Sequence, residues 1–488
     1  MNKKVKETDF ILTDSGKHIN GILRFKTTIA FILTLFATIM ATIIKYIVVD
    51  DFGKYLGEYA FLCYVAVVLG HIFVLTSLVL YGFVSTKDWL IKPKIFVLLL
   101  FCILSGYVSC LFLSEISYYF MPVYLTAYLL SPLLGKKDTF VANLIMNMFL
   151  FMSLAVECIV IGSDLLPAFI MLVIGIISGS LIAYGISDDP RKLNYLIKGT
   201  IINCTSVAVM MILTFIKTDD PLSFVDNLSY MAISTMACLI IGLLMQFILE
   251  KIFNLITNSR LVELTDHNAP LIKRLIKEAP GTFNHSISVA GFAETCATAI
   301  GENPYLARAC AYYHDIGKLV NSHFFKENQG EFNPHDNMLP EVSAEIIRNH
   351  TIKGLELCKE YHIPEEIAYV TIQHHGTLPI TVFYNKATKL TDSVVDIYDY
   401  SYHGVPPVTK IAAIIMICDS SEAAIRAMDA PDGERVEKLL TSLIGARISS
   451  GQFDNCGITM HELNVIKQTI IDMYGGVFHQ RVKYPEGK

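Results

Sequence analysis

Apolar residues fill most of the first 256 positions of the chain and give way to a different pattern afterwards. Eight apolar stretches are long enough to cross about 30 Å of hydrocarbon; they lie at residues 27–49, 58–84, 95–114, 117–135, 139–162, 165–187, 195–217 and 228–256. From residue 281 onward, apolar positions recur with the 3.6-residue period of a helix, without sustained strand-type alternation. The pattern predicts an all-α chain in which a polytopic membrane helix bundle precedes a helical domain.

The same pattern divides the chain into four parts. Residues 1–26 form a polar N-terminal tail, 27–256 the transmembrane region, 257–280 a linker and 281–488 the helical domain. The linker mixes Lys273, Arg274 and Lys277 with apolar residues at helical spacing, which predicts one amphipathic juxtamembrane helix. Such a helix lies on the membrane surface, acts as a rigid coupling rod, or packs on the domain that follows, and the sequence leaves these options open.

The distribution of basic residues predicts the orientation of the chain, because cytoplasmic loops carry an excess of lysine and arginine. The N-terminal tail and every second loop contain Lys3, Lys4, Lys6, Lys17, Arg24, Lys26, Lys87, Lys92, Lys94, Lys136, Lys137, Arg191, Lys192 and Lys198. The intervening loops are mainly acidic, with Asp50, Asp51, Glu115, Asp164, Asp219, Asp220 and Asp226, and with Lys54 and Lys217 as exceptions. An even number of spans then places both the N-terminus and the helical domain in the cytoplasm.

The composition supports a chain that lies partly in the lipid bilayer. Its hydrophobic content is 53% and its charged content 17%, far from the average of soluble proteins. The net charge of −6 argues against a broad basic surface, so we expect no nucleic acid polymer as a partner.

One acid and two amides fall inside the fifth apolar stretch. Glu157 is either a sensing or coupling group or a residue of helix packing. Asn143 and Asn147 lie one turn apart and are expected to form hydrogen bonds between helices.

Ionisable side chains gather on the inward faces of the helical domain. These are five histidines and two aspartates: His285, His314, Asp315, His350, His374, His375 and Asp419. Asp419, for example, follows Ile411 and Ile415 on one apolar stripe. Burying such groups is costly unless they are paired or bound to a metal, and the nearby sequence offers few cationic partners for the two aspartates. The set therefore predicts a metal centre.

The number and kind of donors indicate which ions bind. Seven donors exceed the four of a tetrahedral zinc site, so two ions that share a carboxylate are the simplest arrangement, with Asp315 as the bridge. Imidazole and carboxylate donors without thiolate suit iron or manganese, while zinc stays open. Two divalent ions about 3.5–4 Å apart activate water against a phosphate ester. The sequence predicts a two-metal hydrolase at a membrane surface.

The stretch His314–Lys318 (HDIGK) resembles the signature of HD-domain phosphohydrolases. Further stretches resemble the 7TM-HD family, the membrane-anchored cyclic di-AMP phosphodiesterases of the PgpH type: FNHSIS at 283–288, YYHDIGK at 312–318, FFKENQ at 324–329, NPHD at 333–336, QHHGT at 373–377, IMICDSSEAA at 415–424 and FHQRVKYPE at 478–486. The resemblance covers essentially all of residues 257–488, and the eight-span half resembles the same architecture. It identifies the chain as similar to a multi-pass protein of the bacterial cell membrane.

The resemblance implies a ligand set and a reaction. One metal would lie on His285, His314, Asp315 and Asp419, and the other on Asp315, His350, His374 and His375. The implied reaction is hydrolysis of cyclic di-AMP to the linear dinucleotide pApA. Many members of the family carry a large extracytoplasmic domain after the first span, whereas only residues 50–57 stand at that place here. This departure puts ligand sensing by such a domain in doubt.

Candidates for catalysis and substrate contact are fewer and weaker. If the helix continues past His314, Lys318 would lie one turn further along and stabilise charge in the transition state; otherwise it is a surface lysine. Asp315 acts in catalysis as the bridge. The weaker candidates for substrate contact are Thr377, Tyr384, His323, His335 and Arg426, and Arg426 is also placed to orient Asp419.

Three functions are compatible with the sequence. The leading hypothesis is a membrane-tethered cyclic di-AMP phosphodiesterase whose transmembrane half regulates or localises the HD domain. The second hypothesis is an HD hydrolase with the same chemistry that acts on cyclic di-GMP or an alarmone. The Gly-Tyr-Pro extension of HD-type cyclic di-GMP enzymes is absent after His375, which weakens this hypothesis. The third is a membrane receptor or transporter with a catalytically silent nucleotide-sensing domain. Whether the chain forms a homodimer stays open.

Overall fold

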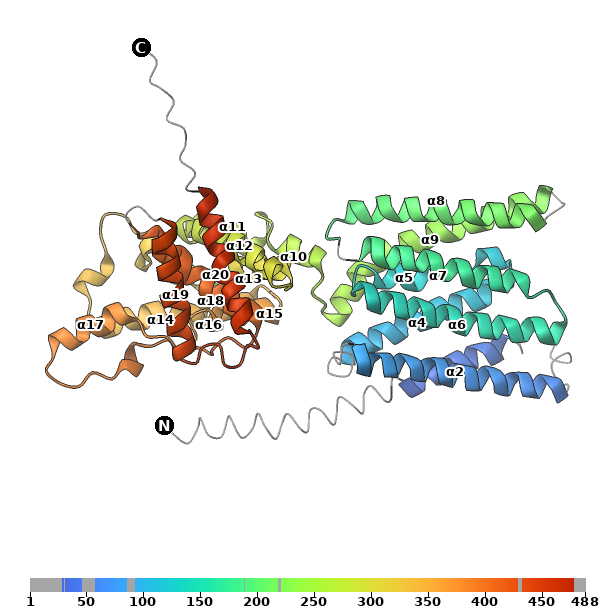
Figure 1. Cartoon of the computed structure of the whole chain (residues 1–488), viewed down its shortest axis with the longest axis horizontal. Coiled ribbons are helices and arrows are strands. Elements are labelled where there is room, and N and C mark those ends of the chain that lie inside the picture. The colour runs from blue at the N-terminus through green and yellow to red at the C-terminus, as the bar shows by residue number, and fades with distance from the viewer. Residues whose placement is uncertain are drawn as a thin grey trace, which may run out of the picture. The chain divides into compact units, whose positions relative to one another are not determined.

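The computed structural model describes residues 29, 31–45, 58–85, 93–187, 189–217, 221–428 and 432–477 (Figure 1). These residues form helices and connecting turns, with one isolated bridge between Pro379 and Ser401 and no strand among them, which confirms the all-α prediction. The chain divides into two compact units, Met1–Ser259 and Arg260–Lys488. The basic N-terminal tail and the stretch 478–486 lie outside the described residues.

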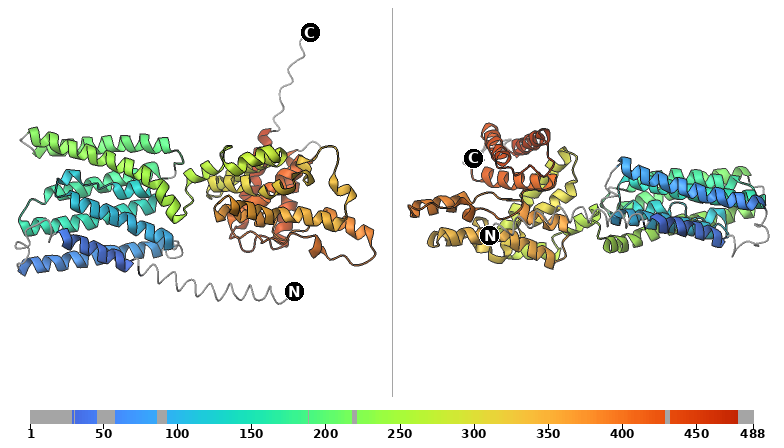
Figure 2. Two further views of the ribbon diagram at one scale, coloured as in Figure 1. Left: turned by 180° about the vertical axis from the view of Figure 1, so that it is seen from behind. Right: turned by 90° about the horizontal axis from the view of Figure 1, so that it is seen from below.

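Long helices lie side by side in the first unit, as the views from two further sides show (Figure 2). They are a helix at Phe31–Lys45, α2 (Glu58–Ser85), α4 (Pro93–Leu113), α6 (Lys136–Ile161), α7 (Leu166–Ile186), α8 (Lys192–Lys217) and α9 (Pro221–Phe253). Within the described residues, five are long and apolar enough to cross a membrane: Lys94–Leu113, Lys136–Ile161, Leu166–Ile186, Lys192–Ile212 and Leu222–Phe253. Large apolar side chains such as Phe73 and Ile212 are exposed, as expected for helices that lipid covers.

The predicted span at 117–135 is wrong in form, because it is not one helix. It contains a 3₁₀ turn, η2 (Tyr118–Phe120), and the short helix α5 (Leu125–Leu130), separated by an extended stretch around Pro122. Six helical residues rise about 9 Å, too little to cross a bilayer. Residues 121–131 are all buried, which suits irregular backbone at membrane depth, since it must be shielded from lipid by protein.

Buried polar contacts tie this broken segment and its neighbours together. The Asn147 side chain donates to the carbonyl of Val123 at 3.2 Å, and the Asn143 side chain donates to the carbonyl of Gly175 on α7 at 2.9 Å. The expected hydrogen bond between helices is thereby confirmed for Asn143, whereas Asn147 bonds to the turn that precedes α5. Gly175 permits the close approach, because a Cβ there would lie 2.1 Å from Asn147 Oδ1.

Glu157 belongs to a buried ion-pair cluster. Lys45 Nζ lies 2.5 Å from Glu157 Oε2 and 2.7 Å from Glu115 Oε1, and it donates to Ser114 Oγ at 3.0 Å. The Lys45 side chain is fully buried. The contact accounts for the buried acid as a paired group that joins Phe31–Lys45 to α6, while a sensing role for Glu157 stays a prediction.

The linker differs from the single helix that was expected. It forms two short helices, α10 (Asn258–Leu264) and α11 (Pro270–Glu278). Pro270 occupies the first turn of α11, where its missing N–H does no harm. The apolar stripe Leu271, Ile272 and Leu275 is buried, and α11 packs on α12 and η3 of the same unit. Of the three options for this helix, packing on the following domain is the one observed.

The second unit is built around helix α18 (Lys410–Arg426). Its other elements are α12 (Pro280–Ala299), α13 (Pro304–Tyr313), η3 (Ile316–Phe324), η4 (Lys326–Asn328), η5 (Pro334–Asn337), α14 (Pro340–Glu360), α15 (Glu365–Ala368), α16 (Val370–Gln373), α17 (Thr381–Leu390), η6 (Ile397–Tyr400), α19 (Gly433–Ser449) and α20 (Met460–Val477). The run Ile411–Cys418 is buried throughout, and α18 contacts α12, α13, α16 and α19. The next residue, Asp419, is thereby held in the interior.

Candidate metal centre

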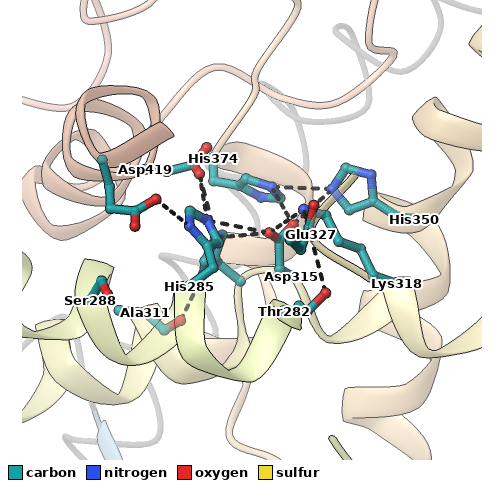
Figure 3. Close-up of polar contacts among 12 residues, drawn as sticks. Thr282, His285, Ser288, Ala311, Asp315, Lys318, Glu327, His350, His374 and Asp419 are labelled. Carbon is teal, nitrogen blue, oxygen red and sulfur yellow. Dashed lines mark hydrogen bonds and ion pairs between the residues drawn. The ribbon is translucent and has the colours of Figure 1, made fainter. Parts of the chain in front are cut away.

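Five separate segments of the second unit supply the predicted donors. His285 lies on α12, His314 and Asp315 stand between α13 and η3, and His350 lies on α14. His374 and His375 directly follow α16, and Asp419 lies on α18. In Figure 3 the labelled donors point toward one another, with Asp315 between the others: His285, Asp315, His350, His374 and Asp419.

The donors fall into two groups that share one residue. His285, His314, Asp315 and Asp419 form the first, and Asp315, His350, His374 and His375 form the second. Within each group the ligand atoms lie within 4.8 Å of one another. The structure thus brings all seven predicted donors together, in the same two groups that the resemblance implies. We name the two groups position A and position B.

The Asp315 carboxylate faces both positions at once. Its Oδ2 lies 3.7 Å from Nε2 of His285 and 3.2 Å from Nε2 of His314. Its Oδ1 lies 3.2 Å from Nε2 of His350 and 3.5 Å from Nε2 of His374. Each oxygen is therefore directed at a different histidine pair, which is the arrangement a bridging ligand requires.

The donor set fits divalent ions. His314 Nε2 and Asp315 Oδ1 are buried without a hydrogen-bond partner within the described part of the chain. Buried polar atoms without partners are rare and are commonly explained by a missing water or ion. Imidazole and carboxylate ligands without thiolate are typical of iron and manganese sites. The two groups of donors could each hold such an ion.

The adjacent residues His314 and Asp315 lie at a break between two helices. Helix α13 ends at Tyr313 and the 3₁₀ segment η3 starts at Ile316, so the α-helix does not continue to Lys318. Gly317 lies against α14, where a Cβ would come within 1.9 Å of the His350 carbonyl oxygen. Only glycine allows this approach, which brings Asp315 and His350 to the same place.

Lys318 reaches the centre despite the change of helix type. Its Nζ lies 2.7 Å from Asp315 Oδ2 and 2.7 Å from Glu327 Oε1, and its side chain is 13% exposed. Burial lowers the pKa of Lys318, but the two carboxylates outweigh it and hold the pKa above its usual value. Lys318 is therefore a charged, buried group beside the donors and not a surface lysine.

The two positions differ in their electrostatics. Burial lowers the pKa of His285, but Asp419 and Glu422 outweigh it and raise that pKa to about 9. Burial lowers the pKa of His374, and burial together with the neighbouring His374 lowers that of His375 well below its usual value. Burial would raise the pKa of Asp315, yet Lys318 and His314 hold it well below its usual range. Beyond the shared Asp315, two further carboxylates, Asp419 and Glu422, thus lie on the side of position A.

The weaker candidates for substrate contact lie in different places. Thr377, two residues after His375, exchanges hydrogen bonds with Gln452 at 3.2 and 2.9 Å. Tyr384 packs with Tyr400 in a small hydrophobic cluster on α17 and η6. His335 contacts the carbonyl of Phe324 at 3.0 Å, and His323 packs on the Phe324 ring.

Arg426 does not contact Asp419 directly. Its Nη2 donates to Glu422 Oε1, and the other Glu422 oxygen lies 2.7 Å from His285 Nδ1. The guanidinium therefore reaches the centre through an intervening carboxylate.

Three residues that belong to the centre escaped the sequence reasoning. Glu422 lies one turn after Asp419 on the same face of α18, a spacing that points to it. Glu327 on η4 pairs with Lys318 on η3, nine positions earlier, and Tyr402 stacks on His375 with ring centroids 4.3 Å apart. Glu327 lies within the stretch FFKENQ that resembles the family, but no periodic pattern indicated a role for it or for Tyr402.

Comparison with known proteins identifies the second unit. Residues 282–424 match the family model described as HD domain. Cyclic-di-AMP phosphodiesterase PgpH of Listeria monocytogenes serotype 1/2a (strain 10403S) is 39% identical over 316 residues, which cover 64% of this chain and 44% of that protein. The protein of the same name from Bacillus subtilis (strain 168) is 41% identical over 249 residues, which cover 51% of this chain and 35% of that protein.

A solved structure is also similar. The crystal structure of the L. monocytogenes phosphodiesterase PgpH HD domain in complex with cyclic-di-AMP has 44% sequence identity and a TM-score of 0.42, and the match covers 44% of this chain and 100% of that one. The chain spans less than half the length of the curated PgpH relatives that it matches. Residues 282–424 therefore carry an HD domain, and the chain is homologous to the PgpH proteins over 64% and 51% of its length.

Proposed function

We propose that the chain is a membrane-tethered two-metal phosphodiesterase that hydrolyses cyclic di-AMP to pApA. The observation that carries the proposal is the Asp315 carboxylate, whose Oδ2 faces His285 and His314 while Oδ1 faces His350 and His374. The names of the homologous proteins support the substrate. The experiment below tests this proposal against two alternatives: another nucleotide substrate, or a catalytically silent sensor.

Seven donors in two groups are suited to two divalent ions, iron or manganese. Such ions, when bound, supply an activated water and neutralise charge on a phosphodiester. The water oxygen bonds to phosphorus, the bond from phosphorus to the ribose 3′ oxygen breaks, and that oxygen takes up a proton. One such step opens the ring and leaves pApA with a 5′ phosphate. Asp315 keeps both positions within reach of the same phosphate.

Lys318 is the residue we propose to stabilise negative charge in the transition state. Glu327 and Asp315 hold its ammonium group from two sides, so it is oriented before substrate arrives. Thr377 lies two residues from His375, and its hydrogen bonds with Gln452 fix its position beside the donors. Substrate contacts by Thr377, Tyr384 and Arg426 are further parts of the proposal.

The first unit would hold this chemistry at the bacterial membrane. Its apolar helices, five of which are long enough to cross a bilayer among the described residues, support a multi-pass arrangement. The basic residues predict that the N-terminus and the HD domain both lie in the cytoplasm. We propose that the membrane half regulates or localises the HD domain, and whether two chains pair is left to experiment.

The test is product analysis on the full chain purified in detergent and loaded with manganese or iron. Incubation with cyclic di-AMP should yield pApA, identified by mass spectrometry. Turnover of cyclic di-GMP or an alarmone without turnover of cyclic di-AMP rejects the substrate. Tight binding of cyclic di-AMP without any turnover, by a chain that holds two ions, favours the silent sensor.

A further inference from the structure

The four histidines whose Nε2 atoms face Asp315 are not supported in the same way. The Nδ1 atoms of three of them lie against backbone carbonyls of their own helices: His314 against Ala311 at 2.7 Å, His350 against Ile347 at 2.6 Å and His374 against Val370 at 3.1 Å. His285 differs, because its Nδ1 lies 2.7 Å from the carboxylate Oε2 of Glu422. A charged acceptor therefore supports one histidine, and neutral acceptors support the other three.

Glu422 is held in place on both of its oxygens. Its side chain is 4% exposed, and it comes from α18 one turn after the donor Asp419. Oε2 accepts from His285, and Oε1 accepts from the Arg426 guanidinium one turn further along the same helix. Burying a carboxylate is costly unless it is paired, and here both oxygens are paired. Glu422 is thus fixed beside His285 and does not turn into the centre as a ligand.

The charges around the two positions are unequal. Asp315 and Asp419 belong to the donors of position A, and Glu422 stands behind His285 of the same position. Asp315 is the one carboxylate among the donors of position B, where the other three are histidines. A carboxylate that accepts from a ligating histidine fixes the tautomer and ring orientation and raises the basicity of the metal-facing nitrogen. Both effects favour a divalent cation at position A.

We propose that Glu422 is a positioning residue that orients His285 and makes position A the tighter of two unequal cation positions. The inference rests on the proposed function, since it takes the seven donors as metal ligands. In a chelator titration, one ion should leave at low chelator concentration and the second only at a higher concentration. The ion that leaves first is that of position B.

The test isolates each position by removing a donor that belongs only to the other. His374→Ala disables position B, and His285→Ala disables position A. Glu422→Gln is then added to each background, and the dissociation constant for Mn²⁺ is measured on the full chain in detergent by equilibrium dialysis with metal analysis. With position A alone, Glu422→Gln should weaken binding by about 10- to 100-fold. With position B alone, it should leave binding unchanged.

Two further variants keep the test decisive if Glu422→Gln lowers expression. Arg426→Ala removes the second support of Glu422 and should weaken position A in the same direction by a smaller factor. Glu434→Gln is the matched control, because Glu434 lies on the exposed face of α19 and pairs with Lys438 there. Glu434→Gln should leave the Mn²⁺ affinity of both positions unchanged. Thermal melting of each variant distinguishes unfolding from a change in affinity.

Equal weakening of both positions by Glu422→Gln, or no weakening of position A, would overturn the inference. Failure of the proposed function has a different signature. A chain that binds two ions of unequal affinity, both assigned as above, but cleaves no cyclic di-AMP would contradict the phosphodiesterase and leave the role of Glu422 intact.

Discussion

Nε2 of His285 lies 3.0 Å from Oδ1 of Asp419, although 134 residues separate them. The two side chains come from α12 and α18, which pack on each other in the core of the second unit. Because each projects from a buried helical face, packing of those faces brings them together. Residues far apart in the sequence thus meet at the centre because each lies on the buried face of its helix.

Removal of the Lys318 ammonium group should slow catalysis without a loss of bound metal. Lys318→Met deletes the group that lies 2.7 Å from Asp315 Oδ2, but Lys318 is not a metal donor. We expect kcat for cyclic di-AMP to fall by about 100-fold or more while metal content stays at the wild-type value. Lys353→Met is the control, because Lys353 pairs with Glu356 on the exposed surface of α14. Unchanged kcat in Lys318→Met would remove the lysine from the mechanism.

Gly317 tests the contact that brings η3 and α14 together. A Cβ at this position would lie 1.9 Å from the backbone oxygen of His350, so Gly317→Ala must push the two segments apart. We expect a loss of about 1–3 kcal/mol in the free energy of unfolding and a lower content of bound metal, since Asp315 and His350 would separate.

Gly291→Ala provides the comparison for this change. Gly291 lies on α12, and a Cβ there meets no atom within 4 Å. This variant should keep its metal and gain up to about 1 kcal/mol, because alanine favours a helix over glycine. If the two variants behaved alike in metal analysis and melting, the close approach at Gly317 would have no importance for the centre.

The buried ion pair of the first unit should contribute strongly to stability. Lys45→Met leaves Glu115 and Glu157 without their shared cation, and an unpaired buried charge costs about 3–5 kcal/mol. Thermal melting in detergent should show a large loss. Lys198→Met is the matched control, because Lys198 pairs with Asp189 but its side chain is 42% exposed. This variant should lower the free energy of unfolding by less than about 1 kcal/mol. Similar losses in the two variants would contradict burial of Lys45.

Glu462 should stabilise the second unit in a way that is lost at acid pH. The Lys410 ammonium and the backbone N–H of Thr459 lower the pKa of Glu462 from 4.5 to about 2. Because the pKa is lower in the folded chain, the stabilisation is present above pH 4.5 and is lost as pH falls toward 2. Glu462→Gln keeps a side-chain acceptor for Thr459, as in other capping boxes, but loses the charge.

The measurement for this prediction is the difference in melting temperature between wild type and Glu462→Gln. The difference should be largest near pH 7 and shrink steadily between pH 5 and pH 3. The exposed variant Glu434→Gln should show little difference from wild type at any of these pH values. A wild-type advantage that stayed constant down to pH 3 would disprove the ion pair as its source.

The sequence indicated which side chains the fold brings together, because the signals for them are local. Each donor stands on or beside a regular helix, so the apolar stripe around it indicated an inward direction, as for Asp419 after Ile411 and Ile415. The resemblance supplied the division into two groups, and the structure places the donors in the same groups. Glu422 was within reach of the same reasoning, since it follows Asp419 by one helical turn.

Features that depend on tertiary contact were predicted poorly. Residues 117–135 are as apolar as a membrane helix, but Pro122 and polar partners such as Asn147 hold them as a broken segment that hydropathy cannot distinguish. The placement of Lys318 one turn after His314 depended on a continuing helix, whereas the chain changes to η3, in which Gly317 lies against α14. Tyr402 comes from irregular chain after η6, and its stacking on His375 has no sequence period to indicate it.

The measurement that tests the two-metal centre most directly is the number of ions bound per chain in wild type and in Asp315→Ala. The full chain, purified in detergent and dialysed against manganese, should hold two ions by metal analysis and should hydrolyse cyclic di-AMP. Asp315→Ala removes the carboxylate that faces both positions, so bound metal and hydrolysis should fall together. A variant that still held two ions per chain would contradict Asp315 as the shared ligand and, with it, the proposed centre.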